Sequence, residues 1–204
     1  MEAVFYVHGM GGSAGEAEHH KPLFGGRDVI GVEYSGGTPR EAAGEILDAV
    51  KKEREKYDGA ALIANSIGAY FSLYASLDRL VDRAYFISPV TDMESVIKGM
   101  MERAGVTEER LKAEKLIPVD GGPALSWEYL SQVRAKPVVW NVPTRILCGE
   151  NDGLIPLDQV KRFAESCGAR ITVMEGGEHW FHTPVQMSFL DEWIINCFKE
   201  KSNG

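Results

Sequence analysis

The sequence has no apolar run long enough to cross a bilayer as a helix. Its first residues, MEAVFYVHGMGG, lack the basic segment and the longer apolar segment of a secretion signal. We therefore expect a cytoplasmic protein with no membrane span. Cysteine is scarce as well. Cys148, Cys167 and Cys197 cannot all pair within the chain and show no CxxC spacing, which favours buried, reduced thiols.

Basic residues are also in deficit, with 22 Lys and Arg against 30 Asp and Glu and a formal net charge of −8. Such a chain would repel nucleic acid, so we expect no nucleic-acid partner. The charge says little about a small-molecule substrate, and the small-molecule acyl substrate that we expect follows from the motifs below. No cluster of His, Cys, Asp and Glu has the spacing of a metal site, and we expect neither metal nor cofactor. The length of 204 residues fits one domain. The oligomeric state cannot be read from the sequence.

Short apolar runs alternate with stretches of helical character, the pattern of parallel strands joined by crossover helices. Most of the runs are almost continuously apolar, as in a sheet covered on both faces. The predicted strands are residues 3–7, 29–34, 60–64, 84–88, 144–149 and 170–174.

Three helix starts carry capping signatures. TPRE at 38–41 combines a cap hydroxyl, a proline and a glutamate, and predicts a helix to about residue 57. TPVQ at 183–186 predicts the C-terminal helix in the same way, and TDME at 91–94 predicts a third capping box at Thr91.

The interval between the fourth and fifth predicted strands is much longer than one crossover helix requires. It contains helix-like pieces around 92–104, 107–114 and 126–135. We expect a cap inserted at about 89–140, together with one crossover helix. Aromatic and methionine side chains there either line a pocket under the cap or only pack its core: Met93, Met100, Met101, Trp127, Tyr129 and Trp140.

Ser66 lies where the third predicted strand turns directly into a helix. Ala64 and Gly68, two positions either side, are small enough for the strand and helix backbones to approach closely. Such a turn lifts the serine hydroxyl above the sheet edge, where the N–H of Ile67 faces an oxygen that becomes negative. Taken alone, the pattern also fits an ordinary strand-helix turn with Ser66 as helix cap.

A glycine-rich loop, HGMGG at 8–12, follows the first predicted strand. It can turn a second backbone N–H, that of Met10, toward the same oxygen. The alternative is a phosphate-binding loop, but the segment has neither GxGxxG spacing nor a GK[ST] ending.

In this order, HGMGG, ANSIG, GENDGLIP and GGEHWFHTP resemble the four signature positions of the α/β-hydrolase family. The resemblance spans essentially the whole chain and implies a three-layer α/β fold with a mostly parallel sheet and a small helical cap. Two departures matter. Ala64 stands where glycine is usual, and the chain starts directly at the HG strand, which implies a reduced sheet of about six strands.

The resemblance also implies a catalytic triad in the order serine, acid, histidine, with Ser66 as nucleophile. This order excludes the histidines before Ser66 and leaves His179 and His182. His179, in the loop after the last strand, matches the family position. His182 directly precedes the helix cap and is a polar neighbour.

Asp152, in GENDGLIP, matches the acid that orients the histidine. Asp92 is the rival because some relatives carry the acid after the previous strand, although its place in a first helical turn already explains it. Glu150 is nearer the strand end, which favours a structural role.

These residues predict a serine hydrolase that cleaves a carboxylic ester through an acyl-enzyme on Ser66. The sequence does not separate an ester from a thioester or amide substrate. The alternative from another class is a non-catalytic binding protein on the same fold. Such a protein is expected to have lost a triad residue, whereas all three positions are filled here.

Overall fold

The computed structural model describes residues 1–199, which form a parallel sheet of six strands. Their order across the sheet is β2-β1-β3-β4-β7-β8. All six predicted strands are present: β1 (Glu2–Val7), β2 (Asp28–Val32), β3 (Gly59–Asn65), β4 (Arg83–Ile87), β7 (Thr144–Gly149) and β8 (Arg170–Met174). β2 ends before its predicted last residue, Tyr34, because that residue leaves the strand to stack on His8.

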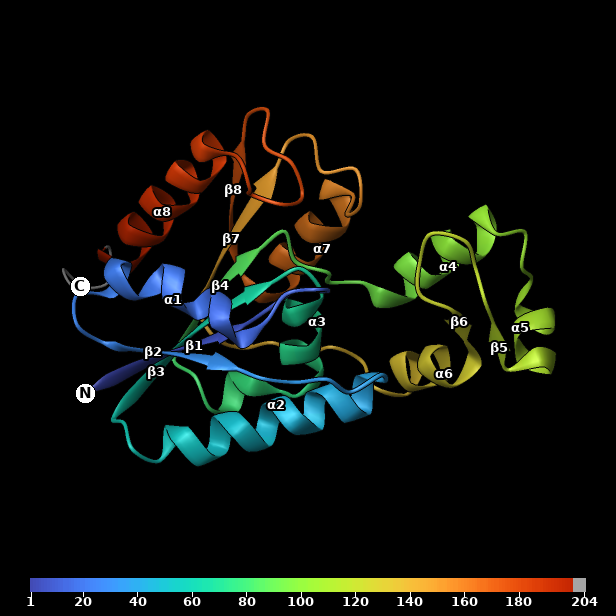
Figure 1. Cartoon of the computed structure of the whole chain (residues 1–204), viewed down its shortest axis with the longest axis horizontal. Coiled ribbons are helices and arrows are strands. Elements are labelled where there is room, and N and C mark those ends of the chain that lie inside the picture. Colours follow the sequence, from blue (N-terminus) through green and yellow to red (C-terminus); the bar gives the residue numbers. More distant parts are fainter. Residues whose placement is uncertain (200–204) are drawn as a thin grey trace.

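Helices cover both faces of the sheet, which makes the three layers visible in Figure 1. Consecutive strand residues alternate between the faces: Phe5 and Leu62 belong to one core, Val4 and Ile63 to the other. On the first face lie α2 (Pro39–Arg54), α3 (Ile67–Tyr74) and α7 (Leu157–Cys167). On the second lie α1 (Ala17–His20) and α8 (Pro184–Lys199). Short 3-10 turns are at Ala14–Glu16, Lys21–Phe24 and Leu77–Arg79.

Two of the three predicted helix caps are confirmed. Thr38 and Glu41 form the capping box of α2, which ends at Arg54 rather than near residue 57. The Thr183 hydroxyl accepts the Gln186 N–H (3.3 Å) at the start of α8. The predicted box at Thr91 is wrong by one residue. Asp92 caps the next helix, because its carboxylate accepts both the N–H (3.0 Å) and the hydroxyl (2.6 Å) of Ser95.

The segment between β4 and β7 lies beyond one end of the sheet (Figure 1). It contains α4 (Met93–Arg103), α5 (Glu108–Glu114), the antiparallel pair β5 (Leu116–Ile117) and β6 (Leu125–Ser126), and α6 (Trp127–Ala135). The pair was not predicted, because two-residue strands leave no alternation in the sequence. We refer to this segment as the cap.

The predicted separate crossover helix is not found within residues 1–199. α6 packs on α4 and α2, and Gln132 accepts the N–H of Arg40 in the first turn of α2 (3.0 Å). Residues 136–143 then reach β7 without another helix.

No disulfide joins the cysteines within the described residues. Cys148 is buried in β7 as predicted, whereas Cys167 and Cys197 are only half-buried. Burial raises the pKa of the Cys148 thiol to about 12. No helix within the described residues has the length and apolarity to span a membrane.

Candidate active site

Ser66 occupies the turn between β3 and α3 with φ 51° and ψ −119°, a conformation that L-residues rarely adopt. Its N–H donates to the carbonyl of Ile87 on β4 (2.9 Å). The turn brings α3 against the end of β1, where a Cβ at Gly68 would lie only 2.3 Å from the carbonyl oxygen of His8. The requirement for a small residue at position 68 follows directly from this close approach.

Ser66, His179 and Asp152 lie within hydrogen-bonding distance in one continuous series. The Ser66 Oγ is 2.9 Å from His179 Nε2, and His179 Nδ1 is 2.8 Å from Asp152 Oδ2. The three residues follow β3, β8 and β7, so one edge of the sheet holds them all. The side chains of His179 and Asp152 are 4% and 6% exposed, and water therefore has little access to their contact.

Asp152 is fixed by its own loop as well as by the histidine. Its Oδ1 accepts the backbone N–H groups of Leu154 and Ile155, both at 2.9 Å. Burial favours the neutral carboxyl group, but the hydrogen bonds from His179 and from these two amides outweigh it and lower the pKa of Asp152. The carboxylate is therefore charged at neutral pH. It lies where it can accept a hydrogen bond from a proton-bearing Nδ1 of His179, and in that tautomer Nε2 can accept a proton from Ser66.

The rival residues are not part of this series. The carboxylate of Asp92 is taken up by Ser95 at the start of α4. Glu150 accepts the N–H of Gly176 (2.9 Å), which ties the loop after β7 to the loop after β8. The side chain of His182 is 63% exposed and lies against the carbonyl of Trp180.

Met10 and Ile67, the two predicted oxyanion donors, both line the cleft that contains Ser66. The loop at 8–12 passes so close that a Cβ at Gly9 would lie 3.3 Å from Cβ of Ser66. The geometry brings both backbones to the serine, and their role as donors stays a prediction.

Two contacts that support this loop were missed by the sequence analysis. Tyr34 stacks on His8 with ring centroids 4.2 Å apart and donates its hydroxyl to the His8 carbonyl (2.8 Å). Tyr6 donates to a carboxylate oxygen of Glu16 just beyond the loop (2.5 Å). Both tyrosines read as ordinary strand residues, and only the tertiary structure shows what they reach.

A cleft of about 1480 Å³ opens above Ser66 and His179, between the sheet edge and the cap. Four apolar residues of α4 line its cap side: Met93, Val96, Ile97 and Met100. The charged cap residues Arg103, Arg110 and Asp120 line the same cleft. Of the six candidate pocket residues, Met93, Met100 and Tyr129 line the cleft, whereas Met101, Trp127 and Trp140 do not. Trp140 packs on Phe86 in the core instead, with ring centroids 5.4 Å apart. Within residues 1–199, no three His, Cys, Asp or Glu side chains gather as ligands around a metal would.

Comparison with known proteins gives matches at the level of structure alone. No family model and no curated protein sequence matches the chain. Est1E from Butyrivibrio proteoclasticus is similar with a TM-score of 0.74 and 15% identity, over 100% of this chain and 88% of that one. Mouse alpha/beta hydrolase domain-containing protein 10 is similar with a TM-score of 0.73 and 17% identity, over 97% of this chain and 90% of that one. A lipase-esterase related protein from Clostridium acetobutylicum is similar with a TM-score of 0.67 and 14% identity, over 96% of this chain and 93% of that one. The chain therefore has the α/β-hydrolase fold.

Proposed function

We propose that the protein is a serine hydrolase that cleaves carboxylic esters through an acyl-enzyme on Ser66. The observation that carries the proposal is the series from Asp152 through His179 to Ser66. The Asp152 carboxylate is 2.8 Å from His179, and His179 is 2.9 Å from the hydroxyl of Ser66, whose backbone is strained. A serine that only caps a helix needs no such histidine.

In the first half of the reaction, His179 Nε2 takes the proton from Ser66 Oγ as that oxygen attacks the ester carbonyl. The backbone N–H groups of Met10 and Ile67 stabilise the negative oxygen of the tetrahedral intermediate. His179 then gives the proton to the leaving alkoxide, and the alcohol departs. In the second half, water attacks the acyl-enzyme with His179 again as base, and the carboxylic acid is released.

The apolar wall of the cleft supports an acyl substrate, and no cofactor is needed for these steps. Similar folds include the lipase-esterase related protein above and RedJ, a thioesterase of prodiginine biosynthesis from Streptomyces coelicolor. Thioesters and amides undergo the same two half-reactions and stay as alternatives. The cytoplasmic location stays a prediction.

The test is hydrolysis of 4-nitrophenyl esters from acetate to dodecanoate, with a thioester and an anilide of one shared acyl group. Wild type should release 4-nitrophenol, and Ser66→Ala should reduce kcat by about three orders of magnitude or more while retaining the native melting temperature. Turnover of the anilide or thioester above that of the matched ester would reassign the scissile bond. Undiminished turnover in Ser66→Ala would refute the mechanism.

A further inference from the structure

The loop at residues 8–12 presents the predicted oxyanion donor, the N–H of Met10, through the peptide group that joins Gly9 to Met10. This peptide is trans, and a trans peptide points its C=O and its N–H in opposite directions. The direction of the Gly9 carbonyl therefore sets the direction of the Met10 N–H. If the peptide flipped, a carbonyl oxygen would take the place of the donor and repel a negative oxygen of the substrate.

Two groups hold the Gly9 carbonyl in place. His8 Nδ1 is 2.8 Å from its oxygen, and the Gly12 N–H donates to it at 3.2 Å. A carbonyl oxygen can only accept, so the contact with His8 is a hydrogen bond when Nδ1 carries the proton. The other ring nitrogen of His8, Nε2, is buried and has no hydrogen-bond partner in residues 1–199. A buried acceptor without a partner lowers stability, so packing alone does not explain a histidine here.

Tyr34 holds His8 at two points. Its ring stacks on the imidazole, with centroids 4.2 Å apart and an angle of 14° between the ring planes. Its hydroxyl donates to the His8 carbonyl (2.8 Å), the oxygen that also lies against Gly68. Burial raises the pKa of the Tyr34 hydroxyl, which therefore keeps the proton that it donates. A tyrosine after β2 thus fixes both the ring and the backbone of the residue that holds the Gly9 carbonyl.

Tyr34 also contacts the element that carries the second predicted donor. Its ring packs at 78° to the ring of Phe71 on α3, with centroids 5.5 Å apart. α3 begins at Ile67, directly after Ser66. One side chain therefore contacts both segments that are predicted to supply an N–H to the oxyanion.

We propose that Tyr34 is a positioning residue: acting through His8, it holds the Gly9–Met10 peptide in the orientation in which the Met10 N–H can donate to the oxyanion. This inference rests on the proposed function, in which Met10 is one of two donors. Loss of Tyr34 should lower kcat, because the oxyanion forms only during the reaction, and leave KM nearly unchanged. Tyr34 also lines the cleft, so the alternative is a role in substrate binding, which would change KM instead.

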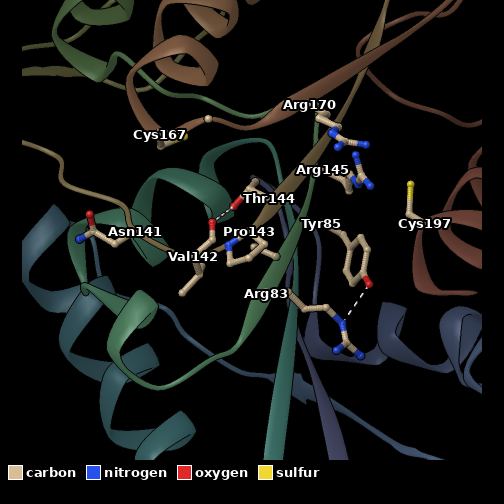
Figure 2. Close-up of a pocket in the computed structure, with 12 residues that line it drawn as sticks. Arg83, Tyr85, Asn141, Val142, Pro143, Thr144, Arg145, Cys167, Arg170 and Cys197 are labelled. Atoms are coloured by element: carbon tan, nitrogen blue, oxygen red, sulfur yellow. Dashed lines mark hydrogen bonds between the residues drawn. The ribbon is translucent and has the colours of Figure 1, made fainter. Parts of the chain in front are cut away.

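The test compares Tyr34→Phe and Tyr34→Leu with Tyr85→Phe in the 4-nitrophenyl ester assay. Tyr34→Phe removes the hydroxyl and keeps the ring, whereas Tyr34→Leu removes the stacking as well. Tyr85→Phe is the matched control, because Tyr85 is a buried tyrosine outside the cleft. Its hydroxyl accepts a hydrogen bond from Arg83 Nε (3.0 Å), as Figure 2 shows. Melting temperatures establish that each variant is folded.

A second readout follows the loop without any substrate. The Gly12 N–H exchanges with solvent when it releases the Gly9 carbonyl, and nuclear magnetic resonance of the ¹⁵N-labelled protein in D₂O measures the exchange rate. In Tyr34→Phe this amide should exchange about three- to tenfold faster than in wild type, the change expected for one lost hydrogen bond. Tyr85→Phe should leave the rate unchanged.

In the ester assay, Tyr34→Phe should lower kcat by about three- to tenfold, and Tyr34→Leu by about 100-fold, close to the loss of an oxyanion donor. KM should stay within about twofold of wild type. Equal kcat values for Tyr34→Phe and Tyr85→Phe would overturn the proposal, as would a change confined to KM or an unchanged Gly12 exchange rate. An inactive wild type would refute the proposed function and this role with it, whereas an active wild type with unaffected Tyr34 variants would refute this inference alone.

Discussion

At the scale of single residues, Ser66 has a strained backbone conformation. Neighbouring strands and helices hold its positive φ: the N–H donates to Ile87, and the carbonyl accepts N–H groups of Ala69 and Val90, both at 3.1 Å. Such a conformation costs about 1–3 kcal/mol and persists only where the surroundings enforce it. This strained conformation places the Ser66 Oγ within hydrogen-bonding distance of His179. A serine that only capped the helix would not need such a conformation.

Replacement of the two candidate acids separates their roles. Asp152→Asn should lower kcat by about 10⁴, as the equivalent change does in a serine protease, because the imidazole adopts the wrong tautomer. Asp92→Asn should keep activity and lose only about 0.3–1 kcal/mol of folding stability, the value of a charge at a helix N-terminus. Steady-state kinetics and thermal unfolding measure the two effects. If Asp92→Asn were inactive and Asp152→Asn active, the catalytic acid would have to be assigned to Asp92, in the loop after β4.

The two histidines differ in burial and contacts, and so should their variants. His179→Ala should lose orders of magnitude in kcat, whereas the exposed His182 should tolerate alanine with little loss. The pH profile of kcat/KM should fall toward acid, because a protonated imidazole cannot accept the Ser66 proton. Asp152 does not cause this fall in activity, because its lowered pKa keeps its carboxylate ionised while the histidine gains a proton. A larger loss at His182 would reverse the assignment of the base.

At the scale of elements, the site depends on how closely α3 approaches β1. The loops after β1, β3, β7 and β8 meet at one edge because the strands are parallel, and Gly68 allows the helix to start there. The cap lies over the same edge and supplies the apolar wall of the cleft without supplying any of the proposed catalytic groups.

Gly68→Ala should destabilise the protein by about 1–3 kcal/mol, because the new Cβ would meet backbone atoms of Val7 and His8 that cannot rotate away. Gly44→Ala, inside α2 with nothing within 4 Å of its Cβ position, should instead stabilise it by about 0.5–1 kcal/mol. Urea denaturation compares the two variants. Equal stability of Gly68→Ala and wild type would show that the close approach is not required.

The cap should determine which ester is preferred and leave the chemistry intact. Met100→Ala widens the cleft and should shift the chain length that gives maximal kcat/KM. Trp127→Ala is the control, because Trp127 belongs to the cap but does not line the cleft. The two variants and wild type are compared across the 4-nitrophenyl ester series. Identical length profiles for all three would leave the cap without a role in specificity.

At the scale of the whole molecule, the features that could be predicted from the sequence are those that depend on short stretches of neighbouring residues. Apolar runs mark all six strands of the sheet, and the motifs around Ser66, Asp152 and His179 mark residues that the fold brings into contact. The two-residue strands of the cap were missed because so few residues carry no periodicity. Contacts between distant segments were missed as well, since neither Tyr34 on His8 nor Arg145 beside Arg170 depends on spacing along the chain.

The central claim is that Ser66 is an activated nucleophile, and covalent labelling tests it most directly. A fluorophosphonate probe reacts with a serine whose oxygen a neighbouring base activates, and peptide mass spectrometry then locates the adduct. We predict one adduct per chain, on Ser66, with no labelling of Ser66→Ala and strongly reduced labelling of His179→Ala. An unlabelled wild-type protein that is folded by its melting transition, or an adduct on another residue, would contradict the account.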